Sequence, residues 1–428
     1  MNTPAPPLRF SYILGFIAFM LGIAMPLRAS GVAPQQAALG LALVASIFVL
    51  VRSIQSRAWF KDALCSTQAK IIAAIFLVWS ITAFFSFDVT GSFKMIARSG
   101  GFILAATAMG SVLYNRQDAH KVLFKALIIS AIVLTFAAVL SLNGVPMILS
   151  AFKGKIIMGA RPIFALKAFA AVALCLIPVV TFAGYKLGRC WWWAGFIYTP
   201  LALITIVSTH NRAALAGFMI MALTTTIAFV VAKRRHIRLL IGTTGTIVMA
   251  GIAWVYSIEK ETVHLKGSYL PEWLVDPHRQ NIWKYAYERF LDHPWVGNGI
   301  DQLNRLPGAK LPVPGLGQSA AWVPSHPHNW AMEILSEAGL IGFLPILFTL
   351  GFVAWQLLKR YRATHNEADL ARLALMAAFW SSALFNFSIW AAWWQLTFFV
   401  LFAIMSCSRE QQIYSSNTSN PPSPTTRS

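Results

Sequence analysis

The sequence has 428 residues, of which 57% are hydrophobic and 12% are charged, and its formal net charge is +20 at pH 7. This apolar share and this scarcity of charge exclude a water-soluble globular protein. Nucleic-acid binding is also disfavoured, because the basic residues lie in short connections beside apolar runs, where they set membrane orientation and meet anionic membrane lipids.

Apolar runs of about 20 residues, the length that crosses a bilayer core of roughly 30 Å, recur along the chain. The first run is interpreted as a retained helix and not as a secretory signal, since it lacks a small-residue cleavage pattern and more runs follow at once. The pattern predicts an all-α, polytopic membrane protein with about twelve transmembrane helices, at 10–26, 36–52, 69–86, 98–114, 121–142, 163–184, 191–208, 212–232, 238–256, 333–358, 368–387 and 389–406.

Lysine and arginine gather in alternate connections between these helices, and the positive-inside rule places such connections in the cytoplasm. With an even number of spans, both termini are then cytoplasmic and the remaining connections lie outside. No disulfide is predicted, because all four cysteines fall in the membrane or on the cytoplasmic side: Cys65, Cys175, Cys190 and Cys407.

The predicted organisation has four parts: helices one to nine in 1–256, a long outer loop in 257–332, helices ten to twelve in 333–407, and a disordered cytoplasmic tail in 408–428. The loop is longer than a helix connection requires, and long ordered loops usually carry function. It should contain short helices. Asp276 as N-cap and Pro277 at the first helical position predict one over 278–290.

Basic residues outside the cytoplasm go against the topological bias and call for another explanation. Each one alone could be an anchor that reaches lipid headgroups. Together they favour a binding site for phosphate or pyrophosphate, whose oxygens pair with the guanidinium fork. The residues concerned are Lys94, Arg98, Lys153, Lys155, Arg161, Arg212 and Arg279.

The segment Ser325–Trp330 holds two histidines on either side of Pro327. His328 is the candidate general base, because imidazole exchanges protons near neutral pH, and Asn329 could cap the following helix. The alternative is that both histidines only brace the junction between loop and helix. A zinc site is disfavoured, since His326 and His328 with Glu333 or Asp276 match no standard ligand spacing. We expect no metal and no cofactor.

Five tryptophans are distributed along the outer loop. Their ring faces could stack on sugar rings or lie at the membrane interface. The five are Trp273, Trp283, Trp295, Trp322 and Trp330.

Several motifs together resemble the O-antigen ligase and polymerase superfamily of bacterial membrane glycan transferases. They are Gly159–Ala160–Arg161 before a span, Ser208–Thr209–His210–Asn211–Arg212 leading into another, Arg279 with Trp283, His293–Pro294–Trp295 with Gly297–Asn298–Gly299, and His326–Pro327–His328–Asn329 with Glu337, Gly339 and Gly342. The resemblance covers Arg161 to Gly342. One departure is the pair His210 and Asn211, where the family more often has small residues before the arginine.

The resemblance implies a GT-C-like enzyme of the bacterial inner membrane, with its active site on the periplasmic side. It implies transfer of a glycan from undecaprenyl pyrophosphate to the lipid A core in lipopolysaccharide biosynthesis, without a metal and with inversion at the anomeric carbon. His328 would then be the base and Arg161, Arg212 and Arg279 would hold the pyrophosphate. His326, Lys94 and Arg98 are further candidate substrate contacts.

Three alternatives stay open: an O-antigen polymerase, a related protein O-oligosaccharyltransferase, and a lipid transporter. The transporter is disfavoured because the unusual polar residues gather at one face and are not spread through the membrane depth. The glycan, the acceptor sugar and the oligomeric state cannot be read from the sequence.

Overall fold

The computed structural model describes residues 8–153, 162–233, 237–259, 270–272, 275–316 and 320–407. Within these ranges every regular element is a helix, and the nearest approach to a strand is an isolated bridge between Pro312 and Ala321. The all-α prediction is therefore confirmed. The helices are α1 (Leu8–Ala24), η1 (Pro26–Ala29), α2 (Val32–Arg52), α3 (Ile54–Cys65), α4 (Thr67–Ala83), α5 (Val89–Leu113), α6 (Gln117–Leu142), α7 (Pro146–Lys153), α8 (Pro162–Leu187), α9 (Trp193–Ser208), α10 (Arg212–Lys233), α11 (Ile237–Glu259), α12 (Pro277–Asp292), η2 (Leu303–Arg305), α13 (Trp330–Thr364), α14 (Glu367–Ala383) and α15 (Ala392–Cys407).

Each of the twelve segments expected to span a membrane overlaps a helix of its own, whereas α3 and α7 were not predicted. By length and composition, six of the described helices can cross a membrane, and α3 with α4, bent by 58°, could make a seventh. Several of the other apolar helices are shorter, among them α9 and α15. The chain is thus consistent with a polytopic membrane protein, but the count of twelve spans is not confirmed.

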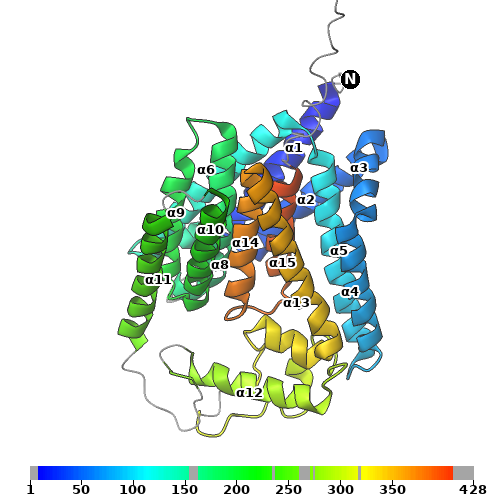
Figure 1. Ribbon diagram of the computed structural model, residues 1–428, viewed down its shortest axis with the longest axis vertical. Helices are drawn as coiled ribbons and strands as arrows, with labels where there is room; N and C mark the ends of the chain where they lie inside the picture. Colours follow the sequence, from blue (N-terminus) through cyan, green and yellow to red (C-terminus); the bar gives the residue numbers. More distant parts are fainter. Residues whose placement is uncertain are drawn as a thin grey trace, which may run out of the picture.

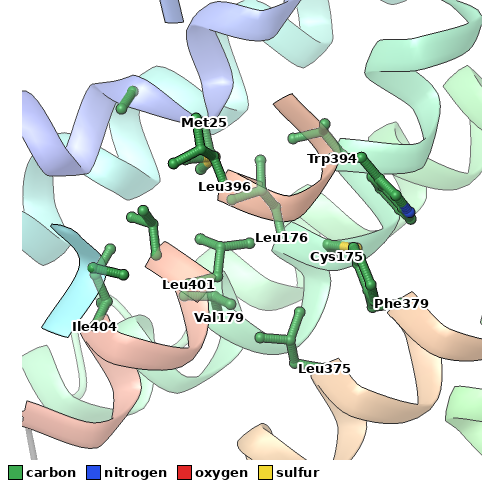
Figure 2. Close-up of a cluster of buried hydrophobic side chains, with 14 of the residues drawn as sticks. Met25, Cys175, Leu176, Val179, Leu375, Phe379, Trp394, Leu396, Leu401 and Ile404 are labelled. Carbon is green, nitrogen blue, oxygen red and sulfur yellow. The ribbon is translucent and has the colours of Figure 1, made fainter. Parts of the chain in front are cut away.

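The core of the bundle is built around α8, whose residues from Phe169 to Gly184 are almost all buried. Figure 2 shows how Cys175, Leu176 and Val179 of α8 meet Phe379 of α14 and Leu401 of α15. Burial on every side matches the sequence of α8, which is apolar around its whole circumference and not along one stripe. The helix therefore has little freedom to move, and it provides a fixed support for the residues at its first turns.

One end of the bundle is closed by α12, which lies across it (Figure 1). We call this end the α12 face. It also carries the connection between α4 and α5, the turn before α10, and residues 384–391, which we call the α14–α15 loop.

The helix α13 is broken near its start, where Gly339 has φ 62° and ψ −170°. A side chain at Gly339 would meet the backbone of Trp295 at 2.3 Å, and one at Gly297 would meet the backbone of Glu337 at the same distance. These two glycines let the segment after α12 pack against the break in α13. There the Pro294 carbonyl accepts the Leu340 N–H at 2.9 Å, and the Trp295 carbonyl accepts the Ile341 N–H at 3.1 Å. The first turns of α13 are thereby separated from its long apolar part and belong to the α12 face.

Candidate active site

The helix α12 places Arg279 in its first turn. Asp276 is the N-cap, as predicted, and its carboxylate accepts the backbone N–H groups of His278 at 2.8 Å and Arg279 at 3.4 Å. Pro277 occupies the first helical position. The guanidinium of Arg279 then lies at the positive end of the helix dipole, where an anion is favoured. Its Nη1 donates to the Phe385 carbonyl of the α14–α15 loop at 2.8 Å.

The turn before α10 brings Arg212 to the same place. Asn211 accepts the Ala214 N–H at 3.0 Å, which caps α10, and its own amide donates to the Lys167 carbonyl at 3.0 Å. This second bond ties the start of α10 to the first turns of α8. Asn211 is one of the two residues at which the sequence departs from the family pattern, and its hydrogen bonds in this turn join the two helices.

Three cations meet here: Lys167, Arg212 and Arg279 lie close enough for their charges to act on one another. Burial lowers the pKa of Arg279, and the positive charge of Arg212 lowers it further, while Asp276 opposes both effects. Cations that lie close together in a partly buried place repel one another, and a polyvalent anion bound beside them would reduce that repulsion.

The two histidines lie beside these cations, on a segment that its neighbours hold from several sides. The indole N–H of Trp283 donates to the Pro327 carbonyl at 2.8 Å, and the Lys310 ammonium donates to the Pro324 carbonyl at 2.8 Å. The rings of His326 and His328 are 4.1 Å apart, centroid to centroid. His328 adopts φ 54°, an uncommon value for a non-glycine residue that the surrounding contacts must maintain.

The hydrogen bond of His328 determines which ring nitrogen can act as a base. Its Nδ1 lies 2.8 Å from the Asn386 carbonyl of the α14–α15 loop, and a carbonyl only accepts, so Nδ1 must carry the proton. Nε2 then has the lone pair. Burial, followed by His326 and Arg279, lowers the pKa of His328 to about 3, so the ring is neutral at pH 7. A neutral imidazole with a lone pair on Nε2 is the form that can take a proton.

His326 is also neutral, because burial lowers its pKa to about 4. Its Nδ1 is 2.9 Å from the Ser325 hydroxyl. A backbone hydrogen bond with Asn386 opposes this lowering of the pKa, so the α14–α15 loop also holds the ring of His326. The role of His326 as a further substrate contact stays a prediction.

The structure thus brings together four of the residues singled out from the sequence: Arg212, Arg279, His326 and His328. Arg161 lies outside the described residues. Lys94 and Arg98 are exposed one turn apart on α5, and Arg98 donates to the Trp390 carbonyl, so it contacts the α14–α15 loop from another side.

Two parts of this cluster escaped sequence reasoning. Lys167 was overlooked although a signal existed: it is a cation inside a predicted apolar span, where charge usually marks function. The carbonyls of Phe385 and Asn386 gave no signal, because a backbone group leaves no trace in the sequence. Among the described residues no group of three or more His, Cys, Asp or Glu side chains is placed to hold a metal ion.

A groove of about 360 Å³ opens at the far end of α12. Its lining includes Phe85, Phe87, His293, Asn298 and, near the end of α12, Arg289. Lys167, Arg212 and Arg279 form what we call the cationic cluster. Arg289, at the groove, is ten positions after Arg279 on α12, so the groove begins roughly 15 Å along the helix from the cationic cluster.

Comparison with known proteins bears on residues 197–347, which match the family described as O-Antigen ligase. This stretch contains Arg212, Arg279, His326 and His328, and Lys167 precedes it. A second similarity, 26% identical over 136 residues, is to a Rickettsia conorii protein provisionally named a polysaccharide ligase. It covers 31% of this chain and 32% of that protein, so the chain matches about a third of the relative's length. The expected family resemblance is thereby confirmed.

Proposed function

With residues 197–347 identified as an O-antigen ligase region, we propose that this chain transfers a glycan from a lipid pyrophosphate to a carbohydrate hydroxyl on the α12 face. The donor is the undecaprenyl-linked glycan and the acceptor is the lipid A core. The observation that carries the proposal is the meeting of Lys167, Arg212 and Arg279 with a neutral His328.

The three cations stabilise the leaving group, which is the lipid pyrophosphate. As the bond between the anomeric carbon and the pyrophosphate oxygen breaks, the electron pair stays on that oxygen and negative charge grows there. Fixed cations that are already partly desolvated stabilise this charge without having to reorganise. Arg279 can do so through a fork of N–H groups, because its bond to the Phe385 carbonyl engages Nη1 alone.

His328 is the base that activates the acceptor hydroxyl, which is the nucleophile. The acceptor hydroxyl attacks the anomeric carbon from the face opposite the pyrophosphate, which inverts the configuration, and its proton passes to Nε2 of His328. In the unliganded site, neighbouring cations help to make this nitrogen a weak base. A bound pyrophosphate offsets their charge, so donor binding raises the basicity of His328 at the moment when a base is needed.

We place the sugars of the reacting glycans along α12, towards the groove at its far end. Phe85 and Phe87 offer exposed aromatic faces, while His293 and Asn298 offer polar groups, and carbohydrate sites combine these two features. Phe84 is a matched control, because it is equally exposed but does not line the groove. Phe87→Ala should raise the KM for a glycan substrate several-fold, whereas Phe84→Ala should not. Equal effects of the two changes would indicate a membrane-interface belt.

The proposed activity is tested by reconstitution. Purified chain in liposomes receives undecaprenyl-pyrophosphate glycan and either lipid A core or a second carrier-linked glycan, in the presence of EDTA, and products are separated on a gel. Ligation to lipid A core in EDTA supports the proposal. Extension of the carrier-linked glycan alone would make the chain a polymerase, and loss of product in EDTA with recovery in magnesium would refute stabilisation by cationic side chains alone.

A further inference from the structure

The α14–α15 loop contacts both reacting parts of the site through its backbone. The Phe385 carbonyl accepts from Arg279, and the next carbonyl, that of Asn386, accepts from Nδ1 of His328, each at 2.8 Å. Within the described residues no carboxylate is hydrogen-bonded to either side chain, although a carboxylate is the usual orienting group for a histidine base. Whatever fixes the backbone of this loop therefore fixes the geometry of Arg279 and His328.

The loop is held at its start by Ser382 of α14, whose carbonyl accepts the Phe385 N–H at 3.0 Å and whose hydroxyl accepts the Asn386 side-chain amide at 3.4 Å. Beyond these residues it is held by Glu333, on the first turn of α13. One carboxylate oxygen accepts the Ser388 hydroxyl at 2.6 Å and the other accepts the Ile389 N–H at 2.8 Å. Ser388 in turn accepts the Trp390 N–H at 3.0 Å. Glu333 is only 2% exposed, so these bonds are shielded from water and are correspondingly strong.

The far end of the loop is held separately by Glu337, one turn further along α13. Its Oε2 accepts the Trp390 indole N–H at 2.6 Å and the Asp301 N–H at 2.8 Å, and its Oε1 accepts the Leu303 N–H at 3.2 Å. Glu337 thus joins the α14–α15 loop to the segment that follows α12. The loop residue that it holds, Trp390, is four residues from Asn386, whereas Ser388 and Ile389, which Glu333 holds, are two and three residues from it.

These contacts form a closed ring. His328 precedes Asn329, the N-cap of α13, whose side chain accepts the N–H groups of Ala331 and Met332. Glu333 follows on the same helix and reaches across to the α14–α15 loop, and the loop returns through the Asn386 carbonyl to His328. A rigid helix and a short loop are therefore joined at two points, which leaves the imidazole one orientation.

We infer that Glu333 is a positioning residue for transfer: by holding Ser388 and Ile389 it fixes the Asn386 carbonyl, and this carbonyl keeps the proton of His328 on Nδ1. The inference rests on the proposed function only in assigning the free Nε2 to the acceptor hydroxyl. If Glu333 served stability alone, its loss would leave the tautomer of His328 unchanged in every variant that folds.

The hydrogen-bond partners of Glu333 and Glu337 differ in whether a glutamine could replace the glutamate. Glutamine at 333 can still accept the Ile389 N–H with its oxygen and donate its amide to the Ser388 oxygen, so Glu333→Gln should preserve the loop. Glutamine at 337 cannot substitute in this way, because all three partners of Glu337 are N–H donors on both of its oxygens. One amide N–H would then face another N–H, an arrangement that costs free energy.

The test is the imidazole ¹⁵N spectrum of histidine-labelled protein at pH 7, with the His328 signals identified by their loss in His328→Gln. The unaltered protein should show His328 with its proton on Nδ1. Glu333→Ala should give a mixture of tautomers, Ser388→Ala should shift the population in the same direction, and Glu333→Gln should match the unaltered protein. Asp369→Asn, which disturbs a buried carboxylate beside Arg372 away from the site, is the control for general destabilisation and should change nothing at His328.

A single Nδ1–H tautomer in both Glu333→Ala and Ser388→Ala would overturn the inference, and Ser388→Ala keeps the test decisive if Glu333→Ala does not fold. Turnover is the second readout: kcat should fall at least tenfold in Glu333→Ala and recover to within a few-fold in Glu333→Gln. If the tautomer responds as expected while the unaltered protein transfers no glycan, the positioning role stands and the proposed function fails.

Discussion

Replacing Arg279 by lysine keeps the positive charge and removes the fork, so it isolates what the guanidinium shape contributes to donor binding. A guanidinium has five N–H donors, of which one is used by the Phe385 carbonyl at 2.8 Å. An ammonium has three donors on one nitrogen and cannot keep that bond while forming two parallel bonds to a phosphate. The loss of one charge-assisted hydrogen bond, about 1.5–3 kcal/mol, corresponds to donor binding that is roughly 10 to 150-fold weaker.

The assay is the affinity of the purified protein for undecaprenyl pyrophosphate, measured by calorimetry in detergent. Arg289→Lys is the matched control, since Arg289 lies on the same helix and pairs with Asp292 at 2.8 Å near the groove, away from the cationic cluster. It should bind the lipid pyrophosphate with unchanged affinity. Arg279→Lys binding within twofold of the unaltered protein, or an equal loss in Arg289→Lys, would refute the reasoning.

Lys167→Met keeps the length of the side chain and removes its charge. It should weaken lipid-pyrophosphate binding at least tenfold, and it should raise thermal stability because the repulsion with Arg212 and Arg279 is lost. Unchanged binding would show that Lys167 is not part of the site. The folded-state pKa values of His326 and His328, about 4 and about 3, lie below the ordinary 6.5, so the unfolded chain takes up protons first and stability should fall as the pH drops from about 6.5 towards 4. Melting temperatures against pH should therefore fall less steeply when both histidines are replaced by glutamine, and equal slopes would show that folding does not lower the pKa values of these histidines. A cysteine placed at the exposed Leu311, after replacement of the native cysteines, should react with reagents that do not cross the inner membrane, and reaction only with permeant reagents would invert the topology.

The sequence allowed the helices to be located well, because hydropathy and capping act over short distances. Asp276, Pro277 and Asn329 predicted two helix starts, and both are found where capping side chains satisfy the first N–H groups. The polar α3 and the short α7 were missed, since they are too polar or too short to be expected as membrane spans. The number of membrane spans could not be predicted in the same way, because several apolar helices are shorter than a bilayer crossing requires.

The candidate site was predictable where side chains carry the chemistry and hidden where the backbone does. Arg212, Arg279 and the histidine pair stood out because cations and imidazoles are unusual beside apolar spans. The α14–α15 loop gave no such signal, and it is apolar enough that the sequence assigned its ends to two transmembrane helices. Its carbonyl groups are ones that every residue possesses, and only the fold shows that Glu333 hydrogen-bonds Ser388 and Ile389 of this loop.

The most direct test of the account is a single-turnover measurement with the donor bound at saturation, made on the unaltered protein and on His328→Ala. Donor affinity and thermal stability are measured on the same preparations, so that loss of binding or folding is separated from loss of chemistry. We expect His328→Ala to bind the lipid-pyrophosphate glycan nearly as well and to transfer it roughly 10² to 10⁴-fold more slowly, the usual contribution of a general base. A folded His328→Ala that transfers the glycan at nearly the original rate would contradict the account.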